Sequence, residues 1–290
     1  MNANTPAGTN SDAPPHGELS DVAEQAVVTV EGVDKIFNRS KANQVDALTD
    51  VTLTVATGEF VSLIGPSGCG KSTLLRLIAD LSQPTAGTIR VNGKPAHQAR
   101  LDLDYGMAFQ QAGLFDWRTV KRNVELPLEL RGWDRARRAA RSAEMLELVK
   151  LSDFANHYPW ELSGGMQQRV AIARALAMDP ALLLMDEPFG ALDEMTREHM
   201  QAELMQICAA TGKTTIFVTH SIPEAVYLSN RVVVMSPRPG QITKTVDVDL
   251  GVRDEDARET SAFFTKITEV REALRAIETA SPLGRGIEDR

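Results

Sequence analysis

The chain has 290 residues, a formal net charge of -8 and 43% hydrophobic residues. This length can bury one large core or two smaller ones, and the ordinary globular composition argues against a fibrous or disordered protein. The negative charge gives no support to a general nucleic-acid binder, because such proteins need a basic surface to neutralise phosphates.

Cysteine usage and apolar runs limit the cellular setting. The two cysteines, Cys69 and Cys208, can form neither a disulfide framework nor a metal cluster, which favours a reducing compartment. The longest apolar runs, such as residues 181–185, are far shorter than the ~20 residues of a bilayer span, so we expect any membrane role to come through another chain. Residues 1–25 lack a basic start and an apolar centre, and we predict a flexible tail there, not a signal peptide.

After the tail, apolar and polar residues alternate over residues 27–30 and 48–55, and residues 88–93 resemble a third such segment. This alternation predicts half-exposed strands of an antiparallel sheet. Phe37 follows the first segment. Its ring can stack on an adenine or pack into the core, and the pattern alone does not decide between the two.

A glycine-rich segment at residues 65–73 lies between a predicted buried strand and a predicted helix. Its glycines let consecutive backbone N–H groups and the positive helix end point at one anion, while Lys71 adds a mobile charge. Ser72 places a hydroxyl on the magnesium ion that bridges the terminal phosphates. We predict a nucleotide-phosphate cradle made of Gly65, Pro66, Ser67, Gly68, Cys69, Gly70, Lys71, Ser72 and Thr73.

A further apolar segment ends at Phe109 and is followed by Gln110. Residues from about 113 to 162 then change character, and an Arg- and Ala-rich helix over residues 135–150 indicates a helical insertion. We expect the arginines of this helix to form a solvated face, with a phosphate-binding patch as the alternative.

A second candidate anion-binding turn is the sequence Leu-Ser-Gly-Gly at residues 162–165, before a helix predicted over residues 170–178. Ser163 is placed as an N-cap, and Gly164 and Gly165 expose backbone N–H groups at the positive helix end. Helix capping alone is an equally good explanation of this serine.

Two carboxylates follow a short apolar segment at residues 182–185. Ligands bind at the carboxyl ends of strands in an open parallel sheet, so Asp186 and Glu187 are expected beside the phosphate loop. We predict that Asp186 holds magnesium through its water shell and that Glu187 polarises the attacking water. His220 ends another predicted strand and can sense the terminal phosphate or serve a structural role.

The last part of the chain predicts one more amphipathic helix. Phe263, Ile267, Val270, Leu274 and Ile277 are spaced by three or four residues and form a single apolar stripe. This stripe is expected to pack against the chain itself or against a partner.

Together, GPSGCGKST, Gln110, LSGGMQQR, LLLMDE, Ala-Leu-Asp193 and His220 occur in the order seen in ATP-binding cassette (ABC) proteins, which the chain resembles over residues 27–240. The resemblance implies an α/β P-loop NTPase cassette over residues 26–250, with a RecA-like parallel-sheet core, an N-terminal antiparallel β subdomain and a helical subdomain. Residues 251–290 are left as a C-terminal helical extension.

The resemblance also implies ATP and Mg²⁺ as cofactors and two cassettes that close face to face. Each ATP is then held between the phosphate loop of one copy and the Ser163 turn of the other, with Gly164, Gly165 and Gln168 in that turn. In the same family, Phe37 matches the adenine-stacking aromatic residue, although tyrosine is commoner there. Gln110 matches the glutamine that links magnesium and water to the membrane partner. Asp193 matches a residue of the loop that crosses the dimer, and His220 matches the switch histidine.

Within the family, the spacing and the Met-Ser-Pro-Arg-Pro-Gly ending at residues 235–240 resemble importers of nitrate, sulfonate and taurine. This implies permease subunits, a separate periplasmic or extracellular substrate-binding protein, and a place on the cytoplasmic face of the inner membrane. Residues 115–120 depart from the pattern common in those importers and also resemble relatives that handle pyrimidine precursors of thiamine. Trp117 in this segment is expected to anchor a permease helix, with burial in the core as the alternative.

A soluble ABC ATPase that acts on nucleic acid is the competing function. Such relatives carry two cassettes in one chain or long inserted coiled coils, whereas this sequence has one cassette and no extended heptad pattern. We therefore expect no nucleic-acid partner.

Overall fold

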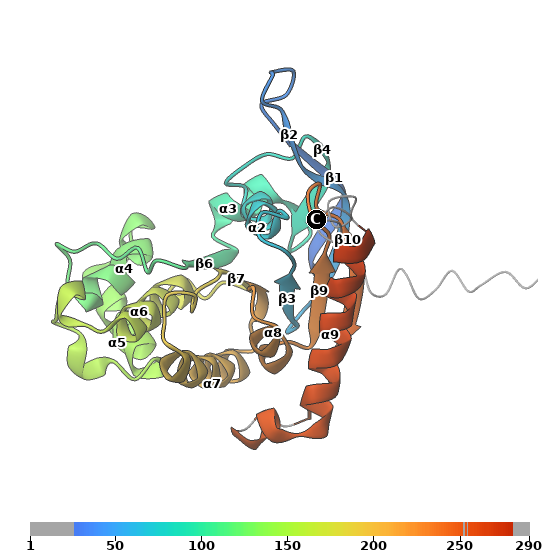
Figure 1. Ribbon diagram of the computed structural model, residues 1–290. Helices are drawn as coiled ribbons and strands as arrows, with labels where there is room; N and C mark the ends of the chain where they lie inside the picture. Colours follow the sequence, from blue (N-terminus) through green and yellow to red (C-terminus); the bar gives the residue numbers. More distant parts are fainter. Residues whose placement is uncertain (1–25, 252, 254, 281–290) are drawn as a thin grey trace, which may run out of the picture.

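The computed structural model describes residues 26–251, 253 and 255–280, and the chain folds into two sheets with helices around them (Figure 1). The predicted tail at residues 1–25 and the last ten residues of the predicted extension lie outside the described residues. Within the part of the chain that is described, no helix has the length and apolar character needed to cross a membrane.

A six-stranded sheet occupies the centre of the fold, in the order β10-β9-β3-β8-β7-β6. Five strands are parallel, and β10 pairs antiparallel with β9 at one edge. All residues of β3, β7 and β8 are buried, which explains why their sequences are almost continuously apolar. The strands are β3 (Phe60–Ile64), β6 (Tyr105–Phe109), β7 (Leu182–Asp186), β8 (Thr214–Val218), β9 (Arg231–Met235) and β10 (Ile242–Asp247).

A second, antiparallel sheet has the order β2-β1-β4-β5. It contains β1 (Ala26–Phe37), β2 (Val45–Ala56), β4 (Ala86–Val91) and the short β5 (Lys94–Pro95). β1 extends well beyond its predicted segment at residues 27–30, whereas β2 is close to its predicted segment at residues 48–55. The second half of β1 was missed because a register shift between Val30 and Val33 interrupts the alternation that sequence reasoning follows. The parallel core and the antiparallel sheet confirm the predicted fold class.

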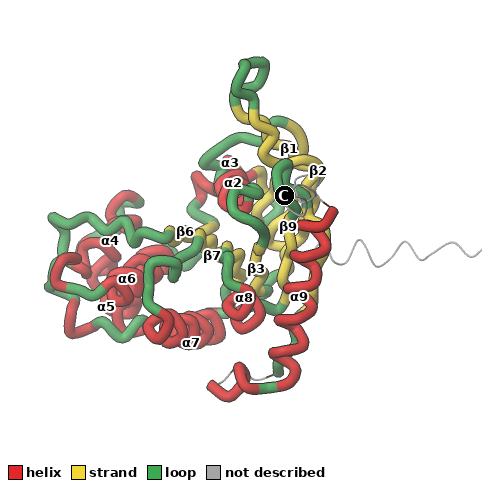
Figure 2. Tube along the Cα trace, viewed as in Figure 1, coloured by secondary structure: helices red, strands yellow, loops and turns green. Residues whose placement is uncertain are grey.

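The helices fall into two groups (Figures 1 and 2). The central sheet carries α2 (Lys71–Ile78), α7 (Glu194–Thr211), α8 (Ile222–Leu228) and α9 (Ser261–Ala280), while α3 (Ala96–Asp102) lies beside β4. The second group is α4 (Val120–Leu130), α5 (Arg135–Leu148) and α6 (Gly164–Leu176), which pack against one another. Within the described part of the chain, short 3₁₀ helices lie at Ser152–Phe154, Pro159–Glu161 and Glu255–Glu259.

The apolar stripe of α9 packs against the chain itself. Phe263, Ile267 and Val270 are buried in the same core cluster as the central sheet, and α9 contacts α8, β9 and β10. In Figure 1 the helix runs along the β9 and β10 edge. Burial within the chain therefore answers the question that the sequence left open for this stripe.

Two helix boundaries differ from the sequence prediction. After the glycine-rich segment, apolar residues recur at helical spacing from Leu74 to Leu81, which predicts a helix that includes Leu81, but α2 ends at Ile78 and Leu81 is 54% exposed. The helix after the Leu-Ser-Gly-Gly sequence begins at Gly164, six residues before the predicted start, because the Ser163 hydroxyl accepts from the backbone N–H of Met166 and caps it there.

The α5 arginines are not all solvated. Arg141 donates from Nε to the Ala177 carbonyl (3.0 Å) and from a terminal nitrogen to the Leu176 carbonyl (3.2 Å). These are terminal carbonyls of α6, which lack helical partners. Arg141 thus ties α5 to the end of α6, and the prediction of a uniformly solvated face was wrong at this residue.

Candidate functional site

The glycine-rich loop connects β3 to α2. Gly70 is the N-cap of α2 and has a φ of 107°, and a Cβ atom on it would lie 2.6 Å from Cδ2 of Leu48, so only glycine fits there. The buried Lys71 begins the helix, and its ammonium donates to the carbonyls of Gly65 (2.8 Å) and Pro66 (3.1 Å). A positive charge and the exposed N–H groups of a helix start therefore lie at one point, an arrangement that suits a phosphate group.

A hydroxyl and a carboxylate meet next to this loop. The Ser72 hydroxyl donates to Oδ1 of Asp186 at 2.6 Å, and Asp186 is the last residue of β7 with only 9% of its surface exposed. Mg²⁺ prefers hard oxygen ligands such as these and is held by a few protein oxygens together with substrate phosphates. The residues present therefore fit a magnesium ion, and its binding here stays a prediction.

Glu187 and His220 face each other beside the same loop. Nδ1 of His220 lies 3.4 Å from Oε2 of Glu187, and both side chains reach solvent. Glu187 has a left-handed φ of 49°, and its backbone N–H is fixed by the Val218 carbonyl at 3.0 Å. This conformation is costly for a residue with a side chain and is concentrated at functional sites. The backbone thus holds a carboxylate at the carboxyl end of β7, next to the phosphate loop.

These groups line one cleft of about 560 Å³. Phe37 forms part of it and is 41% exposed, so its ring is not buried in the core, and stacking on an adenine stays a prediction. The Lys35 ammonium lies 4.9 Å from the ring centroid. The cleft is lined by Phe37, Val45, Ala47, Ser67, Gly68, Gly70, Lys71, Ser72, Thr73, Glu187, His220 and Arg238.

The two predicted glutamines have different environments. Gln110 is exposed, and because Phe109 pairs with Asp186 in the sheet, Gln110 and Glu187 follow neighbouring strands at the same edge. Gln168, in contrast, is 3% exposed and its side-chain amide donates to the Phe109 carbonyl at 3.0 Å. That bond joins α6 to the end of β6. Gln168 thus positions the segment that carries Gln110, and its contact with nucleotide stays a prediction.

The Ser163 turn is not brought to this cleft within one chain. Its glycines lie against the loop before α7 and the helix start, with Leu192 near Gly164 and Thr196 near Gly165. Asp193 caps α7, and hydrogen bonds from Thr196 hold the pKa of Asp193 below its ordinary value. The Ser163 turn and Asp193 are therefore neighbours outside the cleft, as surfaces that serve a second copy would be.

Sequence reasoning missed two residues that shape the site. Arg238 lies in the cleft, although its sequence run served only as a family marker. Asn123 is fully buried and fixes the loop before α4: its Oδ1 accepts from the Phe115 N–H (2.8 Å), and its amide donates to the Phe115, Arg118 and Thr119 carbonyls. Asn123 lies in α4, and a single asparagine in the predicted helical insertion gives no signal of this role.

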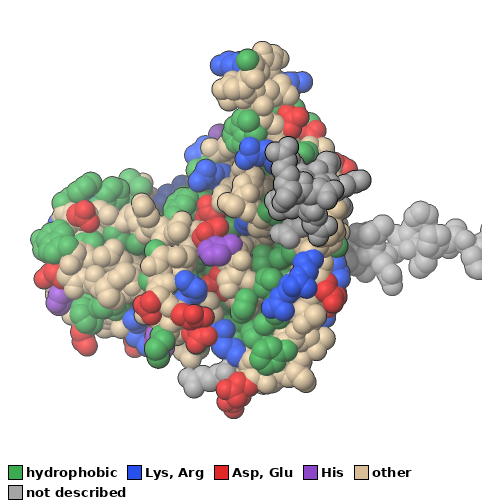
Figure 3. Space-filling view, in the orientation of Figure 1, with side chains coloured by type: hydrophobic (Ala, Val, Ile, Leu, Met, Phe, Trp, Pro, Cys, Tyr) green, Lys and Arg blue, Asp and Glu red, His purple; other side chains and the backbone are tan. Residues whose placement is uncertain are grey.

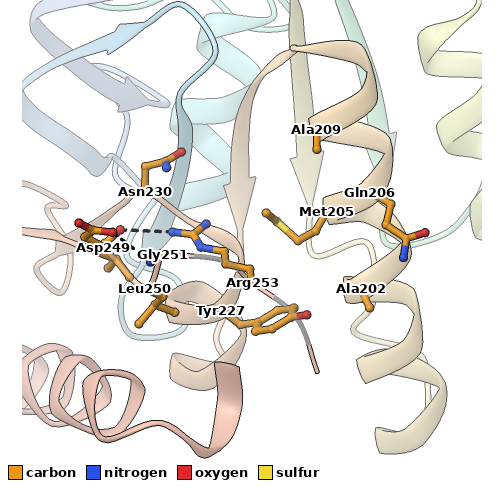
Figure 4. Close-up of a pocket in the computed structure, with 11 residues that line it drawn as sticks. Ala202, Met205, Gln206, Ala209, Tyr227, Asn230, Asp249, Leu250, Gly251 and Arg253 are labelled. Carbon is orange, nitrogen blue, oxygen red and sulfur yellow. Dashed lines mark hydrogen bonds between the residues drawn. The ribbon is translucent and has the colours of Figure 1, made fainter. Parts of the chain in front are cut away.

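A larger cavity of about 630 Å³ lies between α7, α8 and the segment after β10 (Figure 4). Its arginine, Arg253, donates to the carbonyls of Leu228, Ser229 and Val248, and burial lowers its pKa. Because the backbone takes up these donors, the guanidinium fixes the chain after β10. The carboxylate among the described lining residues, that of Asp249, accepts from the Gly251 N–H at 3.0 Å, so the chain itself also engages this group.

Comparisons with known proteins show which family the chain belongs to. Residues 48–190 match the ABC transporter family. An ABC transporter ATP-binding protein, MJ0412, from Methanocaldococcus jannaschii is 48% identical over 83% of this chain and 90% of its own length. Taurine import ATP-binding proteins TauB are also similar: that of Yersinia pestis is 48% identical (71% of this chain, 80% of its own), and that of Jannaschia sp. is 43% identical (85% and 92%).

Solved structures point the same way. The ATP-binding cassette MJ0796, in a dimeric post-hydrolysis state bound to ADP and Pi, superimposes with a TM-score of 0.66 at 36% identity, covering 78% of this chain and all of that one. The chain belongs to the ABC transporter ATPases, of the type that includes the taurine import ATP-binding proteins, and is an ATP hydrolase.

Proposed function

We propose that this chain is the energy-coupling ATPase of an importer that takes up a small anion such as nitrate, a sulfonate or taurine. The observation that carries the proposal is one cleft that the phosphate loop and the Glu187–His220 pair line together, with Asp186 bonded to Ser72 next to it. The printed names of the taurine import relatives support the transport role and the class of substrate.

In the proposed reaction, Lys71 and the loop N–H groups bind the ATP phosphates, and Phe37 stacks on the adenine. A magnesium ion would supply charge neutralisation at the terminal phosphates, with Ser72 holding it through its hydroxyl, Asp186 through its water shell and Gln110 beside them. Glu187 orients and polarises the attacking water, and His220 contacts the terminal phosphate. Each residue thus acts on a group that only a nucleoside triphosphate brings.

The Ser163 turn completes the site of a second copy in this proposal. Two chains close face to face, so that Ser163, its two glycines and Asp193 meet the phosphates bound by the partner copy. Their place outside the chain's own cleft and the dimeric MJ0796 cassette support this assembly. ATP acts as part of the interface, and its hydrolysis opens the dimer.

The loop before α4 is the proposed contact with a permease on the cytoplasmic face of the inner membrane. Phe115 and Trp117 lie with ring centroids 4.9 Å apart, and Trp117 is 73% exposed, so burial within the chain does not account for it. Hydrogen bonds from Asn123 and Arg174 hold the backbone of this loop. Arg174 donates to the Ala112 and Gly113 carbonyls at 2.7 Å each. Figure 3 shows hydrophobic side chains at the surface of the helical part. A rigid loop with an exposed aromatic pair suits a helix of a membrane partner.

Uptake measurements in cells that lack this chain test the proposal. Wild-type protein should restore uptake of labelled nitrate, a sulfonate or taurine, whereas Glu187→Gln should not, because transport needs hydrolysis. The exposed Glu198→Gln on α7 is the matched control and should restore uptake fully. Uptake of all three anions that is equal with and without the chain would contradict the proposed substrate class.

A further inference from the structure

Arg238 lies in the cleft without a role in the function proposed above. It belongs to the loop between β9 and β10, and its terminal nitrogen Nη2 lies 3.2 Å from the Gly68 carbonyl of the phosphate loop. The side chain is exposed and lines the cleft together with Lys71 and Glu187. A guanidinium has five donors in a planar fork, and one of them is spent on Gly68.

The loop that carries Arg238 is tightly fixed. Gly240 donates to the Ala47 carbonyl (2.9 Å) and accepts from the Thr49 N–H (3.1 Å), which joins the loop to β2. The Ser236 hydroxyl bridges the other end of the loop, since it accepts from the Gln241 N–H at 2.9 Å and bonds the Pro239 carbonyl. The prolines on both sides of Arg238 restrict the backbone further. The guanidinium is therefore anchored at the edge of the phosphate loop.

The charged groups in and next to the cleft indicate what the Arg238 guanidinium can bind. Among the described residues that line the cleft, Lys71 and Arg238 are the lysine and the arginine, and Glu187 is the carboxylate. Asp186 adds a second carboxylate next to the cleft. A nucleoside triphosphate brings more negative charge than one magnesium ion and one lysine neutralise when two carboxylates are present. A second fixed cation at the loop offsets that excess.

We propose that Arg238 is a nucleotide-binding residue whose guanidinium donates to the polyphosphate of the bound nucleotide while it retains the Gly68 carbonyl. The ligand class is a nucleoside di- or triphosphate, and arginine suits it because its fork donates to phosphate oxygens in pairs. The proposal rests on the proposed function, in which the cleft binds ATP. It adds a phosphate contact from outside the glycine-rich loop.

Calorimetric titration of the full-length chain with a non-hydrolysable ATP analogue and magnesium tests this contact. Arg238→Ala should raise the Kd about tenfold, in line with the loss of a hydrogen bond between charged groups, and the loss should shrink at high salt. Arg90→Ala is the matched control: Arg90 is exposed and also donates to a glycine carbonyl, that of Gly93 (3.1 Å), but it lies on β4 outside the cleft. Its Kd should equal that of the wild type.

Two conservative variants separate a phosphate contact from mere support of the loop. Arg238→Lys keeps the charge and should recover part of the affinity, whereas the neutral Arg238→Gln should bind as weakly as Arg238→Ala. Recovery by glutamine but not by lysine would show that Arg238 only holds the Gly68 carbonyl, and would overturn the proposal.

Lys71→Ala separates this proposal from the proposed function. If Lys71→Ala loses binding while Arg238→Ala binds as the wild type, the cleft is an ATP site and Arg238 is not part of it. If Lys71→Ala binds the analogue normally, the assignment of the cleft as the ATP site is wrong, and the proposed role of Arg238 is then wrong as well.

Discussion

Gly240→Ala should displace the backbone of the phosphate loop. The substitution is made at a residue that does not line the cleft. A Cβ atom on Gly240 would lie 2.0 Å from the Cys69 carbonyl oxygen, and that oxygen belongs to the loop backbone. A contact of this length must open by more than 1 Å to become an ordinary one, where about 3.4 Å is the lower limit. Because Gly240 is bonded on its other side to Ala47 and Thr49, the loop has to move.

The size of the effect follows from this displacement. Overpacking of a dense interior costs about 1–3 kcal/mol, and at ~2–4 °C per kcal/mol for a chain of this size the Tm should fall by several degrees. A misplacement of about 1 Å in a catalytic geometry can reduce the rate ~10²-fold, so ATP hydrolysis should fall more steeply than stability. Thermal unfolding and steady-state phosphate release measure the two effects.

Gly164→Ala is the matched control for stability. A Cβ atom there meets only Cδ2 of Leu192 at 3.6 Å, an ordinary contact, and the position lies in the first turn of α6. Alanine favours a helix over glycine by up to about 1 kcal/mol, so the Tm should stay level or rise. Gly240→Ala with wild-type Tm and wild-type hydrolysis would refute the idea that β2 and the Arg238 loop brace the phosphate loop.

Three further predictions concern assembly, coupling and pH. Magnesium and saturating ATP should convert the Glu187→Gln variant into dimers, because it keeps the nucleotide that joins two copies; monomers alone in sedimentation would contradict a site completed by Ser163 of a second copy. Trp117→Ala should weaken binding to permease subunits about 30-fold, at ~2 kcal/mol for an interface tryptophan, while the Tm of the isolated chain stays unchanged because the side chain is exposed; a large fall in Tm would place Trp117 in the core instead. Burial raises the pKa of Glu224, so the folded state binds the Glu224 proton more tightly than the unfolded state does. The stabilisation by this proton is therefore greatest below the ordinary glutamate pKa and is lost as the pH rises through the raised pKa. As the pH rises through this range, the Tm should therefore decline less in Glu224→Gln than in the wild type and in the exposed control Glu198→Gln. Identical Tm profiles for all three proteins would contradict this role of Glu224.

The central sheet was predictable from sequence because its strands are buried on both faces. Uninterrupted apolar runs such as residues 182–185 have few alternative structures, and the glycine-rich loop after Ile64 fixes where one strand ends and a helix begins. Boundaries were less predictable where a side chain decides them. The early start of α6 depends on a cap by Ser163, and the length of β1 depends on a bulge that hides its alternation.

The site was predictable where chemistry dictates the residue type at a given spacing. Lys71, Ser72, Asp186 and Glu187 were placed together from sequence, and the structure brings them to one edge of the sheet. Arg238 could not be found that way, because it reaches the loop from a segment 170 positions away from Gly68. No local pattern reports a contact over such a separation.

Single-turnover hydrolysis by Glu187→Gln tests the central claim, that this cleft hydrolyses ATP with Glu187 acting on the attacking water. The substitution keeps the size of the side chain but removes the carboxylate that lies 3.4 Å from His220. We expect the rate of ATP cleavage to fall by about 10²–10⁴-fold while the Kd for ATP stays close to that of the wild type. A near-wild-type rate of cleavage in this variant would contradict the assignment of Glu187 and the mechanism built on it.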